Sequence, residues 1–485
     1  MKFCELIYRE EYVYSEADEE AEIECVTTRI CDINERTLLI VQNSKKAPNL
    51  SEAACLPYAV VCDGEYSPDK SVRTVRVENP RLCAAMIFSR FYRIDYSKMK
   101  FIGVTGTNGK TSTATFIKHI LTKCGKRVGF IGTGKIESQG VILSDENYSM
   151  TTPDPELLYK CIATMQARGC DTVVMEVSSH SLALHKVDAI HFDYGVFTNL
   201  SGEHADFHKS KEAYFEAKKR LFSMCERAVI NLDDKYGRRL ASECPVPTLT
   251  VGALYRGDVF ASDVKRSGFE GVSYLYHGRD FIFRARLSLL GIYNVYNSAL
   301  ACAVCIDMGL LPCEVKSALL SLKKIEGRFE IIKGRPAVII DYAHTDFAFE
   351  NLLKDLTLIK GRGPLTVVFG CGGERDREKR PRTAAAVEKY ADKIIVTSDN
   401  SRGEAPMDII ADIIRGFKEK PFTIIEDREM AIREAILSSP DDGTIAIIGK
   451  GAEKYNIDKT GYHSFDEKAI IERALDKRKR RLRKS

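Results

Sequence analysis

The sequence predicts an α/β protein with three domains: a small N-terminal α/β domain, a central domain with a mainly parallel sheet, and a C-terminal Rossmann-like domain. Three observations indicate this fold class. Short apolar runs alternate with helical patterns over most of the chain, as in parallel sheets that helices cover on both faces. A Gly-rich turn at residues 106–109 joins one such run to a helical pattern. The length of 485 residues suits two to four domains.

The first predicted domain covers residues 1–97. Apolar runs at residues 37–41 and 58–62 are expected strands, and residues 80–92 are an expected helix. This part of the chain contains no evident cluster of catalytic residue types. The polar segment 95–98 then marks the boundary to the next domain.

The central domain is predicted over residues 98–322. Its expected strands, besides the one that leads into the Gly-rich turn, are Val128–Ile131, Thr172–Val177, Tyr194–Thr198 and Arg227–Asn231. Ligands in such sheets collect at the carboxyl ends of the strands. The polar residues that directly follow these strands are therefore candidate site residues.

The third predicted domain covers residues 323–485. Its expected strands are Ala337–Ile340, Leu365–Phe369, Lys393–Val396 and Thr444–Ile448, with helices between them. This pattern indicates a second and smaller nucleotide-binding-like α/β domain.

The composition favours a cytoplasmic protein without membrane insertion. The hydrophobic fraction of 44% is ordinary, and no apolar run approaches the ~18 residues that span a bilayer. The N-terminus carries acidic residues and lacks the apolar core of a signal peptide.

The 15 cysteines are scattered, and most lie in apolar surroundings, so we expect reduced and buried thiols. Examples are Cys124, Cys161, Cys170 and Cys371. The lone pair Cys302 and Cys305 lies in a helical apolar pattern, which favours core packing over a metal or redox motif.

The net charge of +4 is too small to indicate nucleic-acid binding. The exception is the basic tail at residues 477–484, which could touch RNA or an anionic lipid. We expect instead a solvated terminus that frays.

The Gly-rich turn has the features of a phosphate-binding loop. Gly106 and Gly109 allow close approach of the backbone to a phosphate, and Lys110 would neutralise phosphate charge. The hydroxyl of Thr111 would reach Mg²⁺. Val104 stands where the strict template has its first Gly, so the loop is the shorter variant of the motif. We expect the chain to bind a nucleoside triphosphate.

Acidic and imidazole side chains follow two neighbouring predicted strands. Glu176 and His180 come after one strand, and Glu203 and His204 come after the next. Oxygen ligands with an imidazole suit Mg²⁺ or Mn²⁺, whereas no nearby Cys completes a tetrahedral Zn²⁺ set. The pattern predicts a metal site beside the phosphate loop.

Lys218 lies on the same predicted helix face as Tyr214, Ala217 and Leu221, while Lys219 faces solvent. An inward lysine is unfavourable unless it pairs or changes chemically. From spacing alone, we expect its stem to be buried and its ammonium to reach water.

Two further sets of polar residues are candidates. Asn294 and Asn297 stand near a helix start, where helix capping is the simple interpretation. Charged loops follow consecutive strands of the third domain at residues 372–380, 399–402 and 449–453. Together with Arg328 and Asp341 before them, these loops predict a pocket for a zwitterionic or doubly charged small molecule.

With these motifs in place, the chain resembles the Mur ligases, ATP-dependent amide-forming enzymes of peptidoglycan assembly, and within them the tripeptide synthetases. The resemblance covers about residues 98–470. The motifs that carry it are Gly103–Thr113, Thr151–Pro153, Glu176–His180, Asn199–His204, Tyr214–Lys218, Gly327–Glu330, Asp341–His344, Phe369–Asp376, Ser398–Arg402 and Gly449–Glu453.

The resemblance implies an N-terminal UDP-sugar domain, a central P-loop ATPase and a C-terminal amino-acid domain. It also implies roles for individual residues. The nucleotide would be held by Gly106, Thr107, Asn108, Gly109, Lys110, Thr111, Ser112, Asn297 at adenine, Arg328 at the phosphates and Asp341 at the ribose. Two Mg²⁺ sites would use Thr111, Glu176, His204 and a carbamylated Lys218, and Lys110, Glu176, His204 and Lys218 would form the catalytic set. The substrates would be held by Thr151, Thr152, Ser178, Lys186, Arg375, Asp399, Asn400, Ser401, Arg402, Gly449 and Glu453.

The reaction that the resemblance implies joins a diamino acid to a UDP-linked muramoyl dipeptide through an acyl phosphate, and we expect a monomer. Arg402 favours meso-diaminopimelate over lysine, because a guanidinium can bind a second carboxylate. Several positions differ from the family pattern, among them Thr27 and Met150. A paralogue that uses another carboxylate donor therefore stays open, as does a nucleotide-binding regulator without catalysis.

Overall fold

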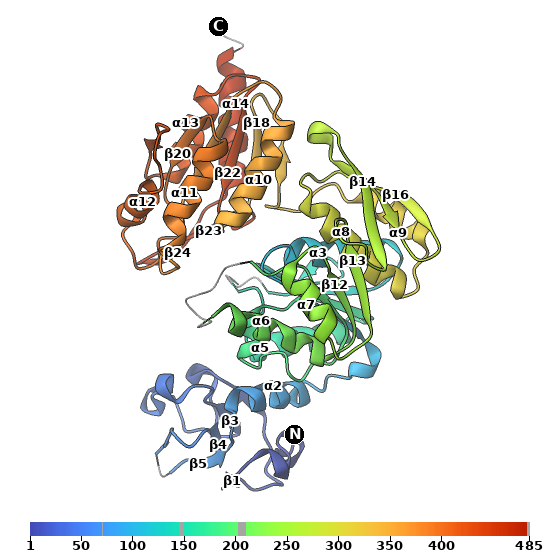
Figure 1. Cartoon of the computed structure of the whole chain (residues 1–485). Coiled ribbons are helices and arrows are strands. Elements are labelled where there is room, and N and C mark those ends of the chain that lie inside the picture. Colours follow the sequence, from blue (N-terminus) through green and yellow to red (C-terminus); the bar gives the residue numbers. More distant parts are fainter. Residues whose placement is uncertain (70, 145–149, 202–209, 483–485) are drawn as a thin grey trace.

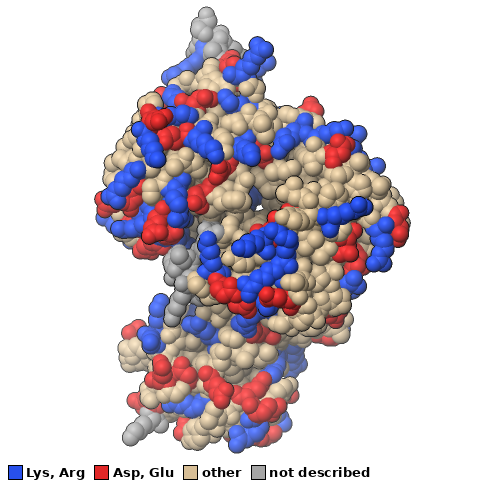
Figure 2. All heavy atoms as spheres, in the orientation of Figure 1, with Lys and Arg blue, Asp and Glu red and all other residues tan. Residues whose placement is uncertain are grey.

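The computed structural model describes residues 1–69, 71–144, 150–201 and 210–482. These residues form three α/β domains that follow one another along the long axis of the molecule (Figure 1). The predicted fold class and domain order are confirmed. Acidic and basic side chains are interspersed over the visible face of all three domains (Figure 2).

The N-terminal domain contains a five-stranded sheet with the strand order β1-β5-β4-β3-β2. Its strands are β1 (Tyr14–Ser15), β2 (Cys25–Thr27), β3 (Thr37–Ile40), β4 (Ala59–Cys62) and β5 (Arg73–Arg76), and its helices are α1 (Phe3–Leu6) and α2 (Pro80–Phe91). The strands β2 to β5 are parallel, and β1 is antiparallel to β5. The Asn79 side chain caps α2 by accepting from two backbone N–H groups.

The central domain contains an eleven-stranded sheet with the order β16-β15-β14-β13-β12-β11-β6-β10-β7-β8-β9. Its strands are β6 (Lys100–Thr105), β7 (Val128–Gly132), β8 (Lys135–Ser138), β9 (Val141–Ile142), β10 (Thr172–Glu176), β11 (Phe192–Phe197), β12 (Cys225–Asn231), β13 (Thr248–Gly252), β14 (Val259–Arg266), β15 (Val272–His277) and β16 (Ile282–Leu287). The strands from β14 to β7 in this order are parallel, and the strands at both edges are antiparallel.

Helices cover both faces of the central sheet. They are α3 (Lys110–Lys123), α4 (Pro155–Ala167), α5 (Ser179–Ala183), α6 (Lys211–Lys219), α7 (Lys235–Glu243), α8 (Tyr293–Asp307) and α9 (Pro312–Ser321). The helices α3, α8 and α9 share one hydrophobic core with the sheet, and α4 to α7 share the core of the other face. This second core continues without a break into the N-terminal domain, where α2 packs against α4.

The C-terminal domain contains a six-stranded sheet with the order β17-β18-β22-β19-β20-β21 and a separate hairpin. The strands are β17 (Glu330–Ile332), β18 (Ala337–Asp341), β19 (Leu365–Phe369), β20 (Lys393–Val396), β21 (Thr423–Ile424), β22 (Thr444–Ile448), β23 (Tyr455–Asp458) and β24 (Gly461–Ser464). The helices are α10 (Asp346–Ile359), α11 (Lys379–Tyr390), α12 (Pro406–Ile414), α13 (Arg428–Ser438) and α14 (Glu467–Leu482). In the six-stranded sheet all pairs except β17 with β18 are parallel, and helices cover both of its faces, which confirms the Rossmann-like expectation.

All 15 cysteines are free thiols, and Cys302 and Cys305 are fully buried in α8, as predicted. Cys124 is only partly buried, because it is the C-cap residue at the end of α3. None of the helices in the described part of the chain combines the length and the apolar character needed to cross a lipid bilayer.

The expectation of a frayed basic tail is wrong up to residue 482. Helix α14 continues to Leu482, and Arg478 donates to the carbonyl of Ile436 (2.9 Å) and to Asp441 (2.7 Å). These contacts tie the tail to the end of α13. Lys477, Lys479, Arg480 and Arg481 are exposed on the helix, so the solvated character is confirmed.

Candidate functional site

A cleft of about 470 Å³ lies between the central and C-terminal domains. Its lining contains most of the predicted site residues, namely Thr107, Asn108, Gly109, Lys110, Thr111, Ser112, Thr151, Thr152, Glu176, Ser178, Lys186, Lys218, Arg328, Arg375, Asp399, Asn400, Arg402, Gly449 and Glu453. Gly106, Asn297, Asp341 and Ser401 are absent from this lining, and His204 lies outside the described residues. Residues of the central and C-terminal domains that lie far apart in the sequence thus meet in this cleft.

The Gly-rich turn between β6 and α3 has no room for side chains. Gly106 and Gly109 have φ values of +149° and +86°, which favour glycine. A Cβ atom on Gly109 would lie 2.5 Å from Oδ1 of Asn297. Gly109 also precedes the first turn of α3, so the N–H groups of that turn and the helix dipole are directed to the same point. The loop fits a phosphate chain, as predicted.

The segment that follows β11 braces this loop. The carbonyl oxygen of Asn199 accepts from the N–H of Thr107 (2.8 Å), and its side chain accepts from the N–H of Asn108 (3.0 Å). Thr198 donates to the carbonyl of Asn108 at 2.6 Å. The Asn199 motif therefore fixes the loop, a role that its position at a strand end did not reveal.

Glu176 is fully buried at the end of β10 and faces the start of α3. Its Oε2 accepts from the hydroxyl of Thr111 at 3.0 Å, and its Oε1 accepts from the N–H of Thr133 at 2.9 Å. The hydroxyl and the carboxylate are hard oxygen donors next to the phosphate loop, so they fit Mg²⁺. Thr133 was not predicted, although it directly follows β7 and could have been found by the same strand-end argument.

A larger metal cluster is not formed by the residues that the structure describes, since no group of three His, Cys, Asp or Glu side chains comes together there. His204, the predicted imidazole ligand, cannot be placed because residues 202–209 are not described. His180 lines the cleft, but its side chain is not part of such a group.

Lys218 points inward from α6, as its helix face predicted, but its ammonium does not reach water. The side chain is 1% exposed, and Nζ donates to the carbonyl of Gly106 at 2.8 Å. Lys110 donates to the same carbonyl at 3.0 Å. The expectation of a solvent-reaching lysine was therefore wrong, because tertiary packing places the phosphate loop over the end of the side chain.

The capping interpretation of Asn294 and Asn297 was also wrong. Ile292 is the N-cap residue of α8, and no side chain caps this helix. Both amides are buried, and Asn297 accepts from the hydroxyl of Thr113 in α3 at 3.3 Å. The amides therefore join α8 to the phosphate-loop helix.

Arg328 connects the two domains across the cleft. Its Nη2 donates to the hydroxyl of Thr111 at 3.0 Å, and its guanidinium lies 4.4 Å from the ring centroid of Tyr342. Asp341 lies behind it and accepts from the N–H groups of Phe329 and Ala343, both at 2.7 Å. Burial raises the pKa of the Asp341 carboxyl. Asp341 thus shapes the backbone that presents Arg328.

Another part of the cleft lies in the central domain near α4 and α5. Lys186 is 7% exposed and forms an ion pair with Asp154 at 2.7 Å. The hydroxyl of Thr152 donates to the carbonyl of Glu176 at 2.9 Å and accepts from the N–H of Ser178 at 3.1 Å. Thr151 is within 3.2 Å of Thr133, so this side of the cleft is joined to the Glu176 site.

The charged loops of the C-terminal domain come together, as predicted. Asn400 donates to Glu453 at 2.8 Å and accepts from Lys450 at 2.8 Å. Arg402 has φ +52° and donates through Nη1 to the carbonyl of Gly373 at 2.9 Å. Arg375 reaches the cleft from the preceding loop. Guanidinium groups, among them Arg375 and Arg402, and carboxylates, among them Asp399 and Glu453, thus line this end together.

Burial and neighbouring charges shift the pKa values of the ionisable groups at this end of the cleft. Burial raises the pKa of Glu453, and the neighbouring Asp399 adds to this effect. Burial alone would raise the pKa of Asp399. The positive charges of Lys450 and Arg428 outweigh burial, so the pKa of Asp399 lies below its usual value. Lys450 is fully buried, and this burial lowers the pKa of its ammonium. Lys450 lies in the charged loop predicted at residues 449–453 but was not singled out there, because its burial depends on contacts with residues far away in the sequence.

Lys379 is another cleft residue that was not singled out, although it lies in the charged segment predicted at residues 372–380. It is the first residue of α11 and lies in the cleft with Lys110, Arg328 and His344. No carboxylate among the described residues forms an ion pair with it, whereas Arg382 one turn later pairs with Asp346 at 3.1 Å. Lys379 therefore brings a cation from the C-terminal domain to the phosphate side of the cleft.

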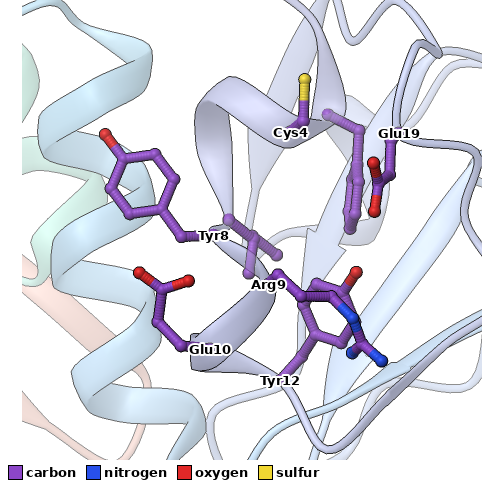
Figure 3. A pocket seen from close by; sticks show the side chains of 8 residues that line it. Cys4, Tyr8, Arg9, Glu10, Tyr12 and Glu19 are labelled. Atoms are coloured by element: carbon purple, nitrogen blue, oxygen red, sulfur yellow. The ribbon is translucent and has the colours of Figure 1, made fainter.

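A second hollow, of about 370 Å³, lies in the N-terminal domain next to α1 and shares no residue with the cleft (Figure 3). Tyr8, Arg9, Glu10 and Tyr12 point into it or along its rim. The Arg9 guanidinium lies 4.9 Å from the ring centroid of Tyr12, so part of this hollow is filled by the protein's own side chains.

The fold and the cleft define a P-loop protein in which a phosphate-binding loop and a charged pocket of a second domain share one cavity. Comparison with known proteins agrees with this class. Residues 104–305 match the Mur ligase middle domain, and residues 327–451 match the Mur ligase glutamate ligase domain. The chain belongs to the Mur ligase family.

Two bacterial relatives are named UDP-N-acetylmuramoyl-L-alanyl-D-glutamate–2,6-diaminopimelate ligase. The one from Caldanaerobacter subterraneus subsp. tengcongensis is 40% identical over 422 residues, 86% of each chain. The one from Clostridioides difficile is 40% identical over 417 residues, 84% of this chain and 85% of its own.

Solved structures extend the similarity to the whole fold. A ligase of the same name covers 99% of both chains at 26% identity, with a TM-score of 0.67. A folylpolyglutamate synthase from Mycobacterium tuberculosis is 18% identical and has a TM-score of 0.63 over 76% of this chain and 92% of its own. This second similarity concerns the fold alone.

Proposed function

We propose that the protein is an ATP-dependent ligase that joins meso-diaminopimelate to UDP-N-acetylmuramoyl-L-alanyl-D-glutamate through an acyl phosphate, in peptidoglycan precursor synthesis. One observation carries the proposal. The C-terminal side of the cleft with the phosphate loop is lined by guanidinium groups, among them Arg375 and Arg402, and by carboxylates, among them Asp399 and Glu453. This set complements an amino acid with two carboxylates and two ammonium groups. The names of the relatives support the same substrates.

ATP would bind with its phosphates on the loop from Gly106 to Ser112, with Asn297 near the adenine and Asp341 near the ribose. Thr111 and Glu176 would hold one Mg²⁺, and His204 with a carbamylated Lys218 would contribute to a second. When bound, Mg²⁺ neutralises phosphate charge. Lys110, Arg328 and Lys379 add three positive charges to the lining of the same cleft.

The reaction has two steps. An oxygen of the donor carboxylate attacks the γ-phosphorus of ATP, the bond from that phosphorus to its bridging oxygen breaks, and ADP leaves. The neutral amine of meso-diaminopimelate then attacks the acyl carbon, the bond to the phosphate oxygen breaks, and phosphate and a proton leave. Lys110 and Arg328 stabilise the charge that develops on the transferred group. Both ligands must be held close together, which a cleft between two domains provides.

We assign the UDP-linked donor to residues 1–97 together with Thr151, Thr152, Ser178 and Lys186 on the central domain. Residues 98–322 would bind ATP, and residues 323–485 would bind the amino acid with Ser401 as part of its pocket. We further propose a monomeric enzyme that works in the cytoplasm, where ATP and UDP-linked precursors are supplied.

A phosphate-release assay tests the proposed function. The protein with ATP, Mg²⁺, UDP-N-acetylmuramoyl-L-alanyl-D-glutamate and meso-diaminopimelate should release phosphate and form the tripeptide product, and omission of either substrate should stop release. The variant Lys110→Met should lose at least about a hundredfold of this activity, because a cation at the transferred phosphate is removed. Absence of release with every diamino acid offered would refute the proposal.

A second candidate is a ligase of the same chemistry with a different carboxylate donor. It is favoured by the contacts of the N-terminal domain, where Thr27, Thr28 and Arg29 are engaged by Glu156 of the central domain. The polar groups of residues 27–29 thus have partners within the protein. Phosphate release with a carboxylate that lacks UDP would support this candidate, and strict dependence on the UDP-linked dipeptide would exclude it.

A further inference from the structure

The C-terminal domain touches the central domain at a second place, through the buried carboxylate of Asp355 on α10. The Asp355 side chain is 6% exposed, and both of its oxygens accept from groups of the central domain. Oδ2 accepts from the backbone N–H of Ile292 at 2.8 Å, and Oδ1 accepts from Nη2 of Arg266 at 3.3 Å. A buried carboxylate is unfavourable unless it is hydrogen-bonded, so these contacts require the two domains to be in place.

The contact with Ile292 lies at the start of α8. Ile292 is the N-cap residue of this helix, and no side chain of the helix itself caps it. The first N–H groups of a helix need acceptors, and the helix dipole favours a negative charge there. Asp355 supplies an acceptor and a negative charge from another domain. Leu290 and Tyr293 next to it pack on the core of the C-terminal domain.

Helix α8 connects this contact to the phosphate loop through buried hydrogen bonds. Asn294 donates to the carbonyl of Leu290 at 2.6 Å, and Asn297 donates to Oδ1 of Asn294 at 3.4 Å. Oδ1 of Asn297 accepts from the Thr113 hydroxyl at 3.3 Å and lies against Gly109. The start of α8 is thus joined to the phosphate-loop helix through Asn294, Asn297 and Thr113.

Helix α10 connects the same contact to the cleft. Its N-cap Thr345 and its first residue Asp346 line the cleft, and Asp355 lies nine residues further along the helix. At about 1.5 Å per residue, roughly 14 Å of rigid helix separates the cleft from the Ile292 contact. A displacement of α10 at its cleft end would therefore reach α8 at Asp355.

We infer that Asp355 is a positioning residue that couples the amino-acid pocket of the C-terminal domain to the phosphate loop through the start of α8. The inference rests on the proposed function, which assigns the two ligands to the cleft. Coupling of this kind is reciprocal, so each ligand changes the affinity of the other by the same factor. Because α8 is held by Asp355 in the arrangement that supports the loop, meso-diaminopimelate tightens nucleotide binding.

The test is the dissociation constant of a non-hydrolysable ATP analogue, measured by titration calorimetry with and without saturating meso-diaminopimelate. In the wild-type protein the amino acid should tighten binding about fivefold or more. In Asp355→Ala this factor should fall close to one. Asp355→Asn should keep most of it, because the amide oxygen still accepts from the Ile292 N–H. If the alanine variant does not fold, Asp355→Ser removes the same contact.

Asp392 offers a matched control. Its carboxylate accepts from a backbone N–H (Leu365, 2.7 Å) and from a cation (Lys360, 2.8 Å), as Asp355 does, but both partners belong to its own domain. Asp392→Ala should keep the coupling factor. A wild-type protein without coupling, or an Asp355→Ala variant that retains it, would overturn the inference. Phosphate release by the wild-type protein is a separate measurement, so a failure of the proposed function is recognised independently.

Discussion

Lys110 and Lys218 both direct an ammonium group at the carbonyl oxygen of Gly106, at 3.0 and 2.8 Å. Two like charges at one acceptor disfavour each other, and Lys218 is in addition buried. Reaction of the Lys218 amine with CO₂ would replace a positive charge with a negative one and so relieve this repulsion. We therefore propose that Lys218 is carbamylated, as the family resemblance implies.

We expect phosphate release to depend on bicarbonate. Activity should fall after removal of CO₂ at mildly acidic pH and should return when bicarbonate is added. Carbon-13 NMR after incubation with labelled bicarbonate should show one carbamate signal in the wild-type protein. Lys218→Arg is the control, since a guanidinium keeps the charge but forms no carbamate there. A wild-type spectrum without that signal would contradict the modification.

Gly449 is a second residue at which the effect of a substitution on substrate binding can be predicted. It has φ +127°, and a Cβ atom there would lie 2.5 Å from Oδ2 of Asp399 in the amino-acid pocket. Backbone strain of this kind costs about 1–3 kcal/mol, so Gly449→Ala should raise the KM for meso-diaminopimelate about tenfold. The dissociation constant of the ATP analogue alone should stay unchanged. Equal losses for both ligands would mean that the turn is structural for the whole cleft.

At the scale of elements, the start of α11 is held by a buried arginine. Arg380 is fully buried and donates to Glu404 at 2.9 and 3.0 Å and to Asp412 at 2.9 Å. These hydrogen bonds lower the pKa of Glu404 to about 2. The pair joins the first turn of α11 to the loop before α12, which carries Arg402, and the N–H of Glu374, next to Arg375, also donates to Glu404.

The Glu404 shift predicts acid sensitivity of the C-terminal domain. Because the pKa is lower in the folded state, the stabilisation is complete above about pH 4.5 and is lost as the pH falls toward 2. Hydrogen exchange in α11 should therefore accelerate over this range in the wild-type protein. Glu404→Gln should show faster exchange at neutral pH and a weaker dependence on pH. An unchanged pH dependence in the variant would assign the acid sensitivity to other carboxylates.

Elements built from local sequence were predicted well. The strands at the centre of each sheet and the phosphate loop were predicted because their apolar runs and turn residues are contiguous, whereas strands such as β13 to β16 were not. Many of the polar residues that follow the predicted strands line the cleft. Residues that act through distant contacts were not predicted. Asn294 and Asn297 were interpreted as caps, and Thr133 meets Glu176 only across 43 residues of chain. Asp355 meets Ile292 across 63 residues, which no periodicity in the sequence reveals.

On the scale of the whole molecule, Glu156 joins the N-terminal domain to the cleft. This residue lies in the first turn of α4 and accepts from the N–H and hydroxyl of Thr28 at 3.0 and 2.9 Å. Thr151 and Thr152, which line the cleft, directly precede that helix. The position of the N-terminal domain relative to the cleft therefore depends on this contact.

Glu156→Ala should raise the KM for the UDP-linked donor about tenfold, because a hydrogen-bonded carboxylate between two domains is removed. The KM for meso-diaminopimelate and the affinity for nucleotide should change by less than about twofold. Steady-state kinetics with each substrate varied in turn will separate these effects. Glu243→Ala, at an exposed carboxylate paired with Lys219 in the central domain, is the control.

The hydrophobic core that passes unbroken from the N-terminal domain into the central sheet has a further consequence. Cutting the chain at residue 97 would expose apolar surface on both pieces, whereas the cores of the C-terminal domain take only a few residues, such as Leu290 and Tyr293, from the central domain. A shortened chain of residues 1–322 is therefore expected to be obtained folded, and one that begins at residue 98 to aggregate. In the course of evolution, recombination between related genes would accordingly succeed near residue 322 and fail near residue 97; with the domain roles proposed above, new amino-acid specificities would be easier to acquire by exchange than new donors.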